Sequence, residues 1–163
     1  MIGFVEDYRK LSNVPAPRKQ WFKLEYAVKS QLELVTDQLK GIEVTLQGET
    51  DLQVHADQAQ CEQVILNVLL NAIYALEGKQ CPKIEIALEK KVQNTWLHIS
   101  DNGKGIAPED LNQVFIPFYT TREKGSGIGL SLSRQIMRNH GGSIALESKK
   151  GEGTKVSLRF NDH

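Results

Sequence analysis

The sequence predicts an α+β fold of two layers, in which helices cover one face of a mixed sheet. Two observations lead to this fold class. Most of the expected strands come in consecutive pairs joined by short turns, and the helices between them are few. With 163 residues, the chain is about the size of one domain and is long enough to bury a sizeable core.

The first part of the chain divides at Pro15–Pro17, which reads Pro-Ala-Pro. Before it, Gly3–Asn13 is predicted to be a short helix without a partner of its own, and we expect it to be the end of a longer element upstream. After it, apolar residues at helical spacing predict a helix over Leu24–Leu39 that stops at Gly41. Pro15–Pro17 therefore separates a short N-terminal helix from the main domain.

The rest of the chain alternates strands with helices. Asp57 is placed to cap the start of a helix that runs to about Leu76 and is closed by Gly78. A further helix is predicted over Ile128–Asn139, where His140 and two glycines end it. The expected strands are Ile42–Leu46, Leu52–His55, Lys83–Glu89, Val92–Ser100, Ser143–Ser148 and Thr154–Phe160, of which the last four form two hairpins, and Pro108–Asn112 is a short helix at most.

The composition argues against several classes of function. The 20 basic and 20 acidic residues balance, so neither a nucleic-acid surface nor a polybasic membrane surface is indicated. No apolar run approaches the roughly 18 residues that span a bilayer, and the N-terminus lacks a signal-peptide pattern. The histidines stand singly, so no metal-ligand spacing is present; they are His55, His98, His140 and His163.

The two cysteines fit a reducing compartment. Cys61 falls near the start of the Asp57–Leu76 helix and Cys81 just past its end. About 20 residues at a helical rise of ~1.5 Å would separate them by ~25–30 Å, which is too far for a disulfide. We expect both to be inert thiols.

A stripe of polar residues runs along the otherwise apolar Asp57–Leu76 helix. Gln60, Gln63, Asn67, Asn71 and Tyr74 are spaced by three and four residues and therefore share one face. A buried amide needs a hydrogen-bond partner, and a magnesium ion that bridges phosphates would supply one. The alternative is a polar face turned toward solvent or another helix.

Asp101 ends a strand in which Leu97 and Ile99 point to the same side. A carboxylate placed there is a fixed acceptor, suited to the amino group of adenine and unsuited to guanine. Gly103 and Gly105 would let the backbone turn and approach a flat base closely. The alternative is an ordinary Asp-Asn-Gly turn.

The run Gly125–Gly129 leads directly into a helix, so its backbone N–H groups and the helix N-terminus form an anion site. It is neither a Walker A motif nor a dinucleotide fingerprint. The polar segment Tyr119–Lys124 before it is expected to close over phosphates, with Arg122 and Lys124 as contacts, unless these two side chains only solvate a loop. We expect Phe118 to anchor one end of this segment.

Five motifs together resemble the N, G1, F, G2 and G3 boxes of the ATP-binding domain of sensor histidine kinases. They are Glu62–Ala72, Asp101–Ile106, Phe115–Thr121, Gly125–Gly142 and Gly151–Thr154. Their order is that of the family, whose superfamily includes DNA gyrase and heat-shock chaperone ATPases. The resemblance covers about residues 24–160, and it is greatest to the nitrogen-regulation and dicarboxylate-sensing group.

The resemblance implies a Bergerat-type sandwich, with three main helices on a mixed sheet of about five strands and ATP beneath a flexible lid. It implies that Asn71 binds magnesium with Asn67 beside it, that Asp101 binds the adenine amino group, and that the second glycine-rich run contacts phosphates. The nucleotide-binding residues expected in this way are Asn67, Asn71, Tyr74, Asp101, Gly103, Gly105, Ile106, Thr120, Thr121, Arg122, Lys124, Gly125, Ser126, Gly127, Ile128, Gly129, Leu130 and Thr154.

The sequence departs from the family at Tyr74, where many members carry a basic residue. The loop is therefore expected to supply more of the phosphate contacts. Asn67 stands where the ATPase branches of the superfamily carry a Glu that activates water, and an amide has no basic lone pair for that task. The site is thus expected to hold Mg-ATP for transfer rather than to hydrolyse it.

No histidine here has the acidic neighbour of the family's phosphoacceptor, so no catalytic residue is assigned and the acceptor is expected on a separate dimerisation domain. Residues 1–18 resemble the end of that domain's hairpin and its hinge, and residues 19–163 the ATP-binding domain. We expect a monomeric, cytoplasmic fragment of a homodimeric kinase that acts on a response regulator and that an inner-membrane segment can anchor. The alternatives are a serine kinase or ATPase of the same superfamily, and a nucleotide-dependent docking module without turnover.

Overall fold

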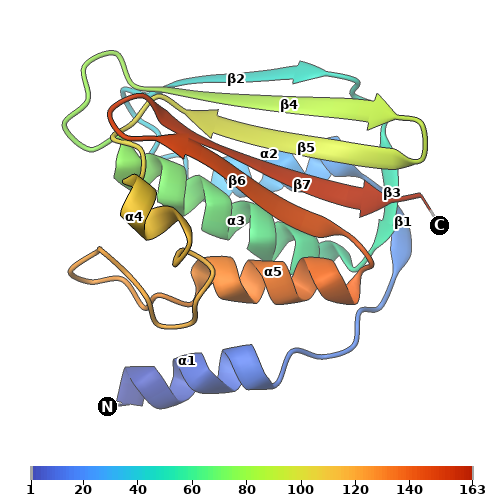
Figure 1. The fold of residues 1–163 in the computed structure, drawn as a ribbon. Helices are drawn as coiled ribbons and strands as arrows, with labels where there is room; N and C mark the ends of the chain where they lie inside the picture. Colours follow the sequence, from blue (N-terminus) through green and yellow to red (C-terminus); the bar gives the residue numbers. More distant parts are fainter. Residues whose placement is uncertain (1, 163) are drawn as a thin grey trace.

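The computed structural model describes residues 2–162, which fold into two layers (Figure 1). One layer is a five-stranded sheet in the order β2-β4-β5-β7-β6. β2 pairs parallel with β4, and all other pairs are antiparallel, so the predicted mixed sheet is confirmed. The strands are β2 (Glu43–Gly48), β4 (Lys83–Lys91), β5 (Asn94–Asp101), β6 (Ser143–Lys149) and β7 (Gly153–Asn161).

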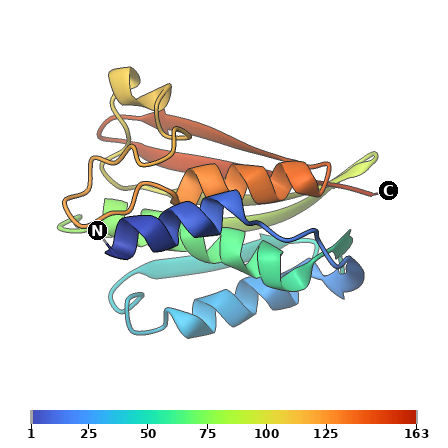
Figure 2. The ribbon, with the colours of Figure 1, turned by 90° about the horizontal axis from the view of Figure 1, so that it is seen from below.

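The other layer consists of three helices on one face of the sheet, α2 (Leu24–Leu34), α3 (Gln58–Ala75) and α5 (Gly129–Asn139) (Figures 1 and 2). α3 lies in the middle and packs against both of the others. The predicted two-layer arrangement with three main helices is therefore confirmed. A single turn, α4 (Pro108–Leu111), lies at one end of this layer.

The core lies between the two layers. In β4 and β5 every second residue is buried, so Ile84, Ile86, Leu97 and Ile99 all point toward the helices. α3 is apolar on most of its circumference because it is covered by the sheet and by two helices. This position leaves only the last turns of α3 free to line a site.

The start of α3 is fixed by several long-range hydrogen bonds. The Asp57 carboxylate accepts from the backbone N–H of Gln60 at 3.1 Å, which confirms the predicted N-cap, and from the backbone N–H of Arg18 at 2.9 Å. The Asp57 N–H donates to Nε2 of the buried His140 at 3.0 Å. The Nδ1–H of His140 donates to the Ile136 carbonyl at 2.7 Å, so this ring is a structural link between α3 and α5.

Two elements differ from the predictions. α2 ends at Leu34 instead of Leu39, because the Thr36 hydroxyl donates to the carbonyls of Leu32 and Glu33 and the chain turns there. A strand that was not predicted, β1 (Gln20–Lys23), pairs antiparallel with β3 (Gln53–Ala56) in a separate two-stranded sheet. β3 therefore lies outside the main sheet.

The helix α1 (Ile2–Ser12) agrees with the predicted N-terminal helix, but it has a partner. It packs beside α5 (Figure 2), and the Phe4 ring lies 4.7 Å from the Phe118 ring, between centroids. The segment that joins α1 to β1 is held by the side-chain amide of Gln60, which donates to the Pro15 carbonyl at 2.9 Å. The predicted division at Pro15–Pro17 is thus a bend fixed on α3.

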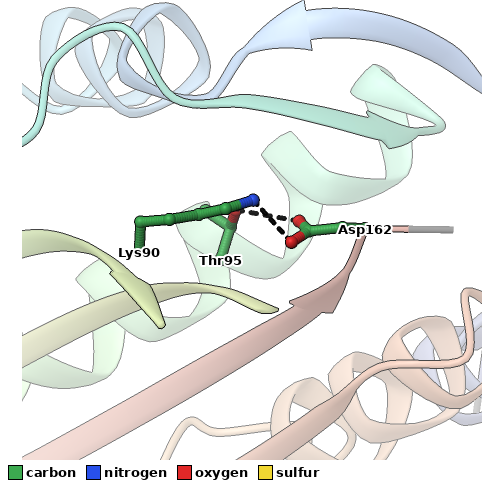
Figure 3. A network of polar contacts seen from close by, with 3 residues as sticks. All are labelled: Lys90, Thr95 and Asp162. Carbon is green, nitrogen blue, oxygen red and sulfur yellow. Dashed lines mark hydrogen bonds and ion pairs between the residues drawn. The ribbon is translucent and has the colours of Figure 1, made fainter. Parts of the chain in front are cut away.

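The C-terminal end of β7 is tied to the β4–β5 hairpin. The Asp162 carboxylate pairs with Lys90 and accepts from the Thr95 hydroxyl at 3.3 Å (Figure 3). The backbone N–H of Asp162 also donates to the Gln93 carbonyl at 3.2 Å. These contacts lie at the end of the sheet opposite to the cavity described below.

The two cysteines are free, as predicted, with Cys61 buried and Cys81 exposed. Burial raises the pKa of the Cys61 thiol to about 12, so it stays protonated. Over residues 2–162, no helix combines the length and apolar character needed to cross a bilayer. The same residues contain no cluster of three or more His, Cys, Asp or Glu that could hold a metal ion.

Candidate functional site

A cavity of about 540 Å³ opens at the end of the helical layer, between the last turns of α3, the loop after β5 and the segment that precedes α5. A second and more open pocket of about 350 Å³ lies at the β6–β7 turn. Its walls are formed by Ile99 and Val156 of the sheet and by residues from four separate parts of the chain. These parts include the motifs that the sequence analysis singled out.

Asp101 lies at one end of the cavity, at the last position of β5. Its carboxylate accepts from the backbone N–H of Gly103 at 2.8 Å. Burial raises the pKa of the Asp101 carboxyl, while the backbone amides of Gly103 and Thr154 oppose that rise. The carboxylate is therefore a partly desolvated acceptor held by backbone groups.

The glycines of this turn are required by neighbouring backbone. A Cβ at Gly103 would lie 2.3 Å from the Ala75 carbonyl oxygen, and one at Gly105 would lie 2.1 Å from the Lys149 carbonyl oxygen. Gly105 also has a φ of +66°, in the left-handed region. The sequence analysis predicted that both glycines let the backbone approach a ligand. The structure shows instead that Gly103 lies against the end of α3 and Gly105 against the β6–β7 turn.

The hydroxyl groups of Ser148 and Thr154 form a hydrogen-bonded pair beside this end of the cavity. They lie 2.7 Å apart, and Ser148 Oγ accepts from the Ile106 N–H at 2.8 Å. Thr154 itself lines the cavity and pairs with Asp101 across β5 and β7. The wall here is thus built on two paired strands.

Toward the other end of the cavity, α3 presents Asn67 and Asn71. Tyr74, also in the wall, lies beside the Asp101 turn, because the carbonyl of the next residue, Ala75, accepts from the Lys104 N–H at 3.0 Å. The Asn67 amide nitrogen donates to the Gly129 carbonyl and to Ser133 Oγ, both at 3.3 Å, and so fixes the start of α5 against α3. The Asn71 amide oxygen accepts from Nη1 of Arg122 at 3.2 Å. These asparagines have partners, as a buried amide requires.

The predicted polar stripe on α3 divides into two parts. Asn67, Asn71 and Tyr74 line the cavity, whereas Gln60 and Gln63 do not. Gln60 is buried at the first turn and holds the Pro15 carbonyl, and Gln63 is exposed. The α3 axis runs past the cavity, so only its last turns reach it.

The Tyr74 ring contacts two cations from different loops. Lys104 Nζ lies 3.9 Å from the ring centroid, and Arg122 Cζ lies 4.2 Å from it. Both distances are within the range of cation–π attraction. The sequence analysis placed Tyr74 in the polar stripe and among the expected nucleotide-binding residues, but it did not predict these two contacts.

The segment 118–127, called here the cavity loop, is closed at its base by the Phe118 N–H, which donates to the Gly127 carbonyl at 2.9 Å. Phe118 has a φ of +66°, which is rare for a residue with a side chain. Gly127 has a φ of +77°, and a Cβ on it would lie 2.5 Å from the Phe118 carbonyl carbon. The loop therefore has a fixed base and a polar, exposed tip.

Inside the loop, the Arg122 N–H donates to the Thr120 hydroxyl at 2.9 Å. The Tyr119 hydroxyl donates to the Asp110 carboxylate of the α4 turn, and this bond raises the pKa of Tyr119. The loop is thus attached to its surroundings by side chains, at Tyr119 and at Arg122.

The N-terminus of α5 faces the cavity through Gly127, Gly129 and Leu130. No side chain caps the first turn of this helix, so its free N–H groups and positive dipole end remain available to an anion.

The structure brings most of the predicted site residues to one cavity. Gly103, Lys124 and Ile128 do not line it: Gly103 packs on α3, Lys124 is exposed, and Ile128 is buried at the helix start. The predicted residues that line it are Asn67, Asn71, Tyr74, Asp101, Gly105, Ile106, Thr120, Thr121, Arg122, Gly125, Ser126, Gly127, Gly129, Leu130 and Thr154.

Sequence reasoning missed two basic residues of the cavity wall, Lys104 and Lys150. They are neighbours because the Lys104 carbonyl accepts from the Gly151 N–H at 2.7 Å. Each lies in a glycine-rich turn that the sequence analysis had identified, and a basic residue in such a turn is the signal that could have found them.

Comparison with known proteins identifies the class. Residues 56–163 match the family described as "Histidine kinase-, DNA gyrase B-, and HSP90-like ATPase". The chain belongs to this family.

The similar proteins are sensor histidine kinases. The chain is 34% identical over 142 residues to the sensor histidine kinase ZraS of Salmonella typhimurium. The matched region covers 85% of this chain and 30% of ZraS. It is 30% identical over 160 residues to a protein of Rickettsia prowazekii described as a putative sensor histidine kinase NtrY-like. That match covers 98% of this chain and 27% of the relative. The chain thus spans less than a third of the length of these relatives.

Among solved structures, a nucleotide-free catalytic domain of the histidine kinase ThkA superposes with a TM-score of 0.80 at 28% identity. The superposition covers 89% of this chain and 96% of that domain. The chain therefore has the fold of a histidine kinase catalytic domain.

Proposed function

We propose that this chain binds Mg-ATP and transfers the γ-phosphate to a histidine on a separate dimerisation domain, as the first step of two-component signalling. The observation that carries the proposal is the convergence of Asp101, Asn71 and the start of α5 on one cavity. Asp101 supplies an acceptor for the adenine amino group, and α5 supplies N–H donors for phosphate. Asn71 also lines this cavity and is the proposed metal ligand.

The residues present fit a magnesium ion. The Asn71 amide oxygen is a hard, neutral donor of the kind magnesium accepts, and it keeps a second lone pair besides the one that accepts from Arg122. When bound, magnesium would neutralise charge on the phosphates, and it needs only one or two protein oxygens as ligands. Asn67 is the proposed second ligand through its oxygen, because its nitrogen holds the Gly129 carbonyl.

The absence of a carboxylate at position 67 supports transfer over hydrolysis. Asn67 donates to Gly129 and Ser133, and its amide cannot accept a proton from water. Arg122 and the α5 N-terminus would stabilise charge on the phosphates while the nucleophile comes from another domain. We therefore expect little ATP hydrolysis by this chain alone.

We propose residues 1–18 as the end of the dimerisation hairpin with its hinge, and residues 19–163 as the ATP-binding domain. The relatives' names support a parent sensor histidine kinase. We propose that this parent acts on a cognate response regulator. We further propose a cytoplasmic, monomeric domain in a homodimeric parent that an inner-membrane segment can anchor. Both cysteines are free, which is typical of a reducing compartment such as the cytoplasm and supports this part of the proposal.

The test is phosphoryl transfer to a supplied acceptor. The chain is incubated with Mg-ATP labelled at the γ-phosphate and with a panel of dimerisation domains from ZraS and NtrY-like relatives, each paired with its histidine-to-alanine variant. We expect label on at least one intact domain, none on its variant, and loss of the label in acid. Nucleotide binding without transfer in any pairing would contradict the proposal.

The same experiment separates the alternatives. A serine kinase of this superfamily would leave an acid-stable label. An ATPase would release inorganic phosphate without any acceptor, against which Asn67 argues. A docking module would bind nucleotide and leave every acceptor domain unlabelled.

A further inference from the structure

The Tyr74 ring is the meeting point of two basic side chains that are far apart in the sequence. Lys104 comes from the turn after β5, and Arg122 comes from the tip of the cavity loop. Their distances to the same ring centroid are 3.9 Å and 4.2 Å, so the two charges can be no further apart than the sum of these lengths. Two like charges this close repel each other unless something offsets them.

No carboxylate offsets them. In the described part of the chain, neither Lys104 nor Arg122 forms an ion pair, although many of the other basic residues do. The negative face of the Tyr74 ring is what attracts both groups, together with the Asn71 amide oxygen for Arg122. The result is a pair of cations that keep their charge available to an anion.

Tyr74 is not needed for the core. It is half-buried in the last turn of α3 and is absent from the hydrophobic core cluster, whereas its neighbour Ile73 packs against that cluster. Its ring contributes to the cavity wall. Lysine and arginine side chains are long and flexible. A ring outside the core that contacts the charged ends of both can therefore fix their positions.

We propose that Tyr74 is a positioning residue that holds Lys104 and Arg122 together on the wall of the nucleotide site, where the turn after β5 meets the cavity loop, so that both cations serve the phosphates; this rests on the function proposed above. Many family members carry a basic residue at this position of α3, and this chain instead gathers its positive charge from two loops around an aromatic ring. The ring acts through the cations and not on the base.

The test compares Tyr74→Leu with Tyr74→Phe in the full chain, with adenosine, ADP and ATP titrated by calorimetry at constant magnesium. Tyr74→Leu removes the ring, and we expect a loss of Mg-ATP affinity of about tenfold. The loss is smaller for ADP, and adenosine affinity stays within about twofold. Tyr74→Phe keeps the ring face and should restore Mg-ATP affinity to within about twofold.

A double-mutant cycle gives a second, independent readout. In a Lys104→Met, Arg122→Met background the ring has no cation to hold, so adding Tyr74→Leu should change Mg-ATP affinity by less than about twofold. Thermal unfolding of each variant checks that the fold is kept.

Equal losses of adenosine and Mg-ATP affinity in Tyr74→Leu would overturn the inference, because the ring would then serve the base or the fold. A Tyr74→Phe variant as weak as Tyr74→Leu would also overturn it, because the hydroxyl and not the ring face would matter. Failure of the unmodified chain to bind both adenosine and Mg-ATP would overturn the proposed function itself, which is a separate outcome.

Discussion

At one end of the cavity, Asp101 is held by backbone amides of its own turn and of a paired strand, whereas at the other end Asn71 is held by the side chain of Arg122. The first end, the base end, is built on β5 and β7. The second, the phosphate end, is built on the cavity loop 118–127 and on the part of α3 that carries Asn67 and Asn71. Backbone contacts between strands open only when the sheet does, while side-chain contacts of a loop exchange easily.

This difference separates recognition from chemistry. A rigid base end can select adenine in the same way whether or not phosphates are present. An adaptable phosphate end can rearrange as the nucleotide, the metal and an incoming histidine change the local charge. Substitutions at the base end should therefore weaken the binding of both adenosine and Mg-ATP, whereas those at the phosphate end should weaken only Mg-ATP binding.

The largest effect is expected at the base end. Asp101→Ala removes a partly buried carboxylate acceptor, and we expect adenosine and Mg-ATP affinities both to fall by about a hundredfold or more. Calorimetry measures both ligands, and Asp101→Asn serves as a control of the same shape without the charge. Normal Mg-ATP binding by Asp101→Ala would show that the base lies elsewhere.

A smaller and more selective loss is expected at the phosphate end. Asn71→Ala removes the proposed metal ligand, so Mg-ATP affinity should fall by about tenfold or more while adenosine affinity is unchanged. The matched measurement is ATP with EDTA, where the variant and the unmodified chain should bind alike. A loss that is the same with and without magnesium would contradict the assignment of Asn71.

Two glycines test the rigidity of the two ends. Gly153→Ala places a Cβ 2.0 Å from the Asp101 carbonyl oxygen at a φ of +126°, and we expect it to lower the free energy of unfolding by about 2 kcal/mol. Gly127→Ala strains the base of the loop, and we expect weaker Mg-ATP binding with a smaller change in stability.

Gly78→Ala is the control for both, because its φ is +74° and a Cβ there would meet no atom within 4 Å. It should cost only about 1 kcal/mol, the penalty of a left-handed residue with a side chain. Urea unfolding curves measure all three variants. A Gly127→Ala variant less stable than Gly153→Ala would reverse the comparison.

The smallest effect is the pH dependence of the base end. The folded-state pKa of Asp101 is raised above its ordinary value of 3.8 by burial, and the ionised form is the better acceptor for adenine. Adenosine affinity should be full above the raised pKa and fall as the pH drops through it, starting at a higher pH than for an exposed aspartate.

The free energy of unfolding should change with pH in the opposite direction to adenosine affinity. Because the folded state binds this proton more tightly than the unfolded state, the unmodified chain should gain stability relative to Asp101→Asn as the pH falls through the same range. Urea unfolding of the two proteins at a series of pH values measures the difference. A gap that does not change with pH would show that Asp101 titrates normally.

Much of the base end could be predicted from the sequence, because its signals are local. The alternation in β5 aims Asp101 at the helical layer. The glycines after Asp101 were recognised, but their reason was not. It depends on carbonyls of Ala75 and Lys149, which only the fold brings close.

The phosphate end could be predicted only in part. The glycine run before α5 is a local signal, whereas the contacts of Tyr74 with Lys104 and Arg122 join residues from three separate segments of the chain. β1 was missed for the same reason, since Gln20–Lys23 becomes a strand by pairing with β3. Long-range pairing of short segments leaves little trace in their own sequence.

Hydrogen exchange tests the two-ended site most directly. Backbone exchange is followed by mass spectrometry in the unmodified chain alone, with adenosine and with Mg-ATP. Adenosine should slow exchange around residues 101–106 and leave residues 119–125 unchanged, whereas Mg-ATP should slow both. Exchange over residues 119–125 that is unaffected by Mg-ATP, or slowed equally by adenosine, would contradict the account.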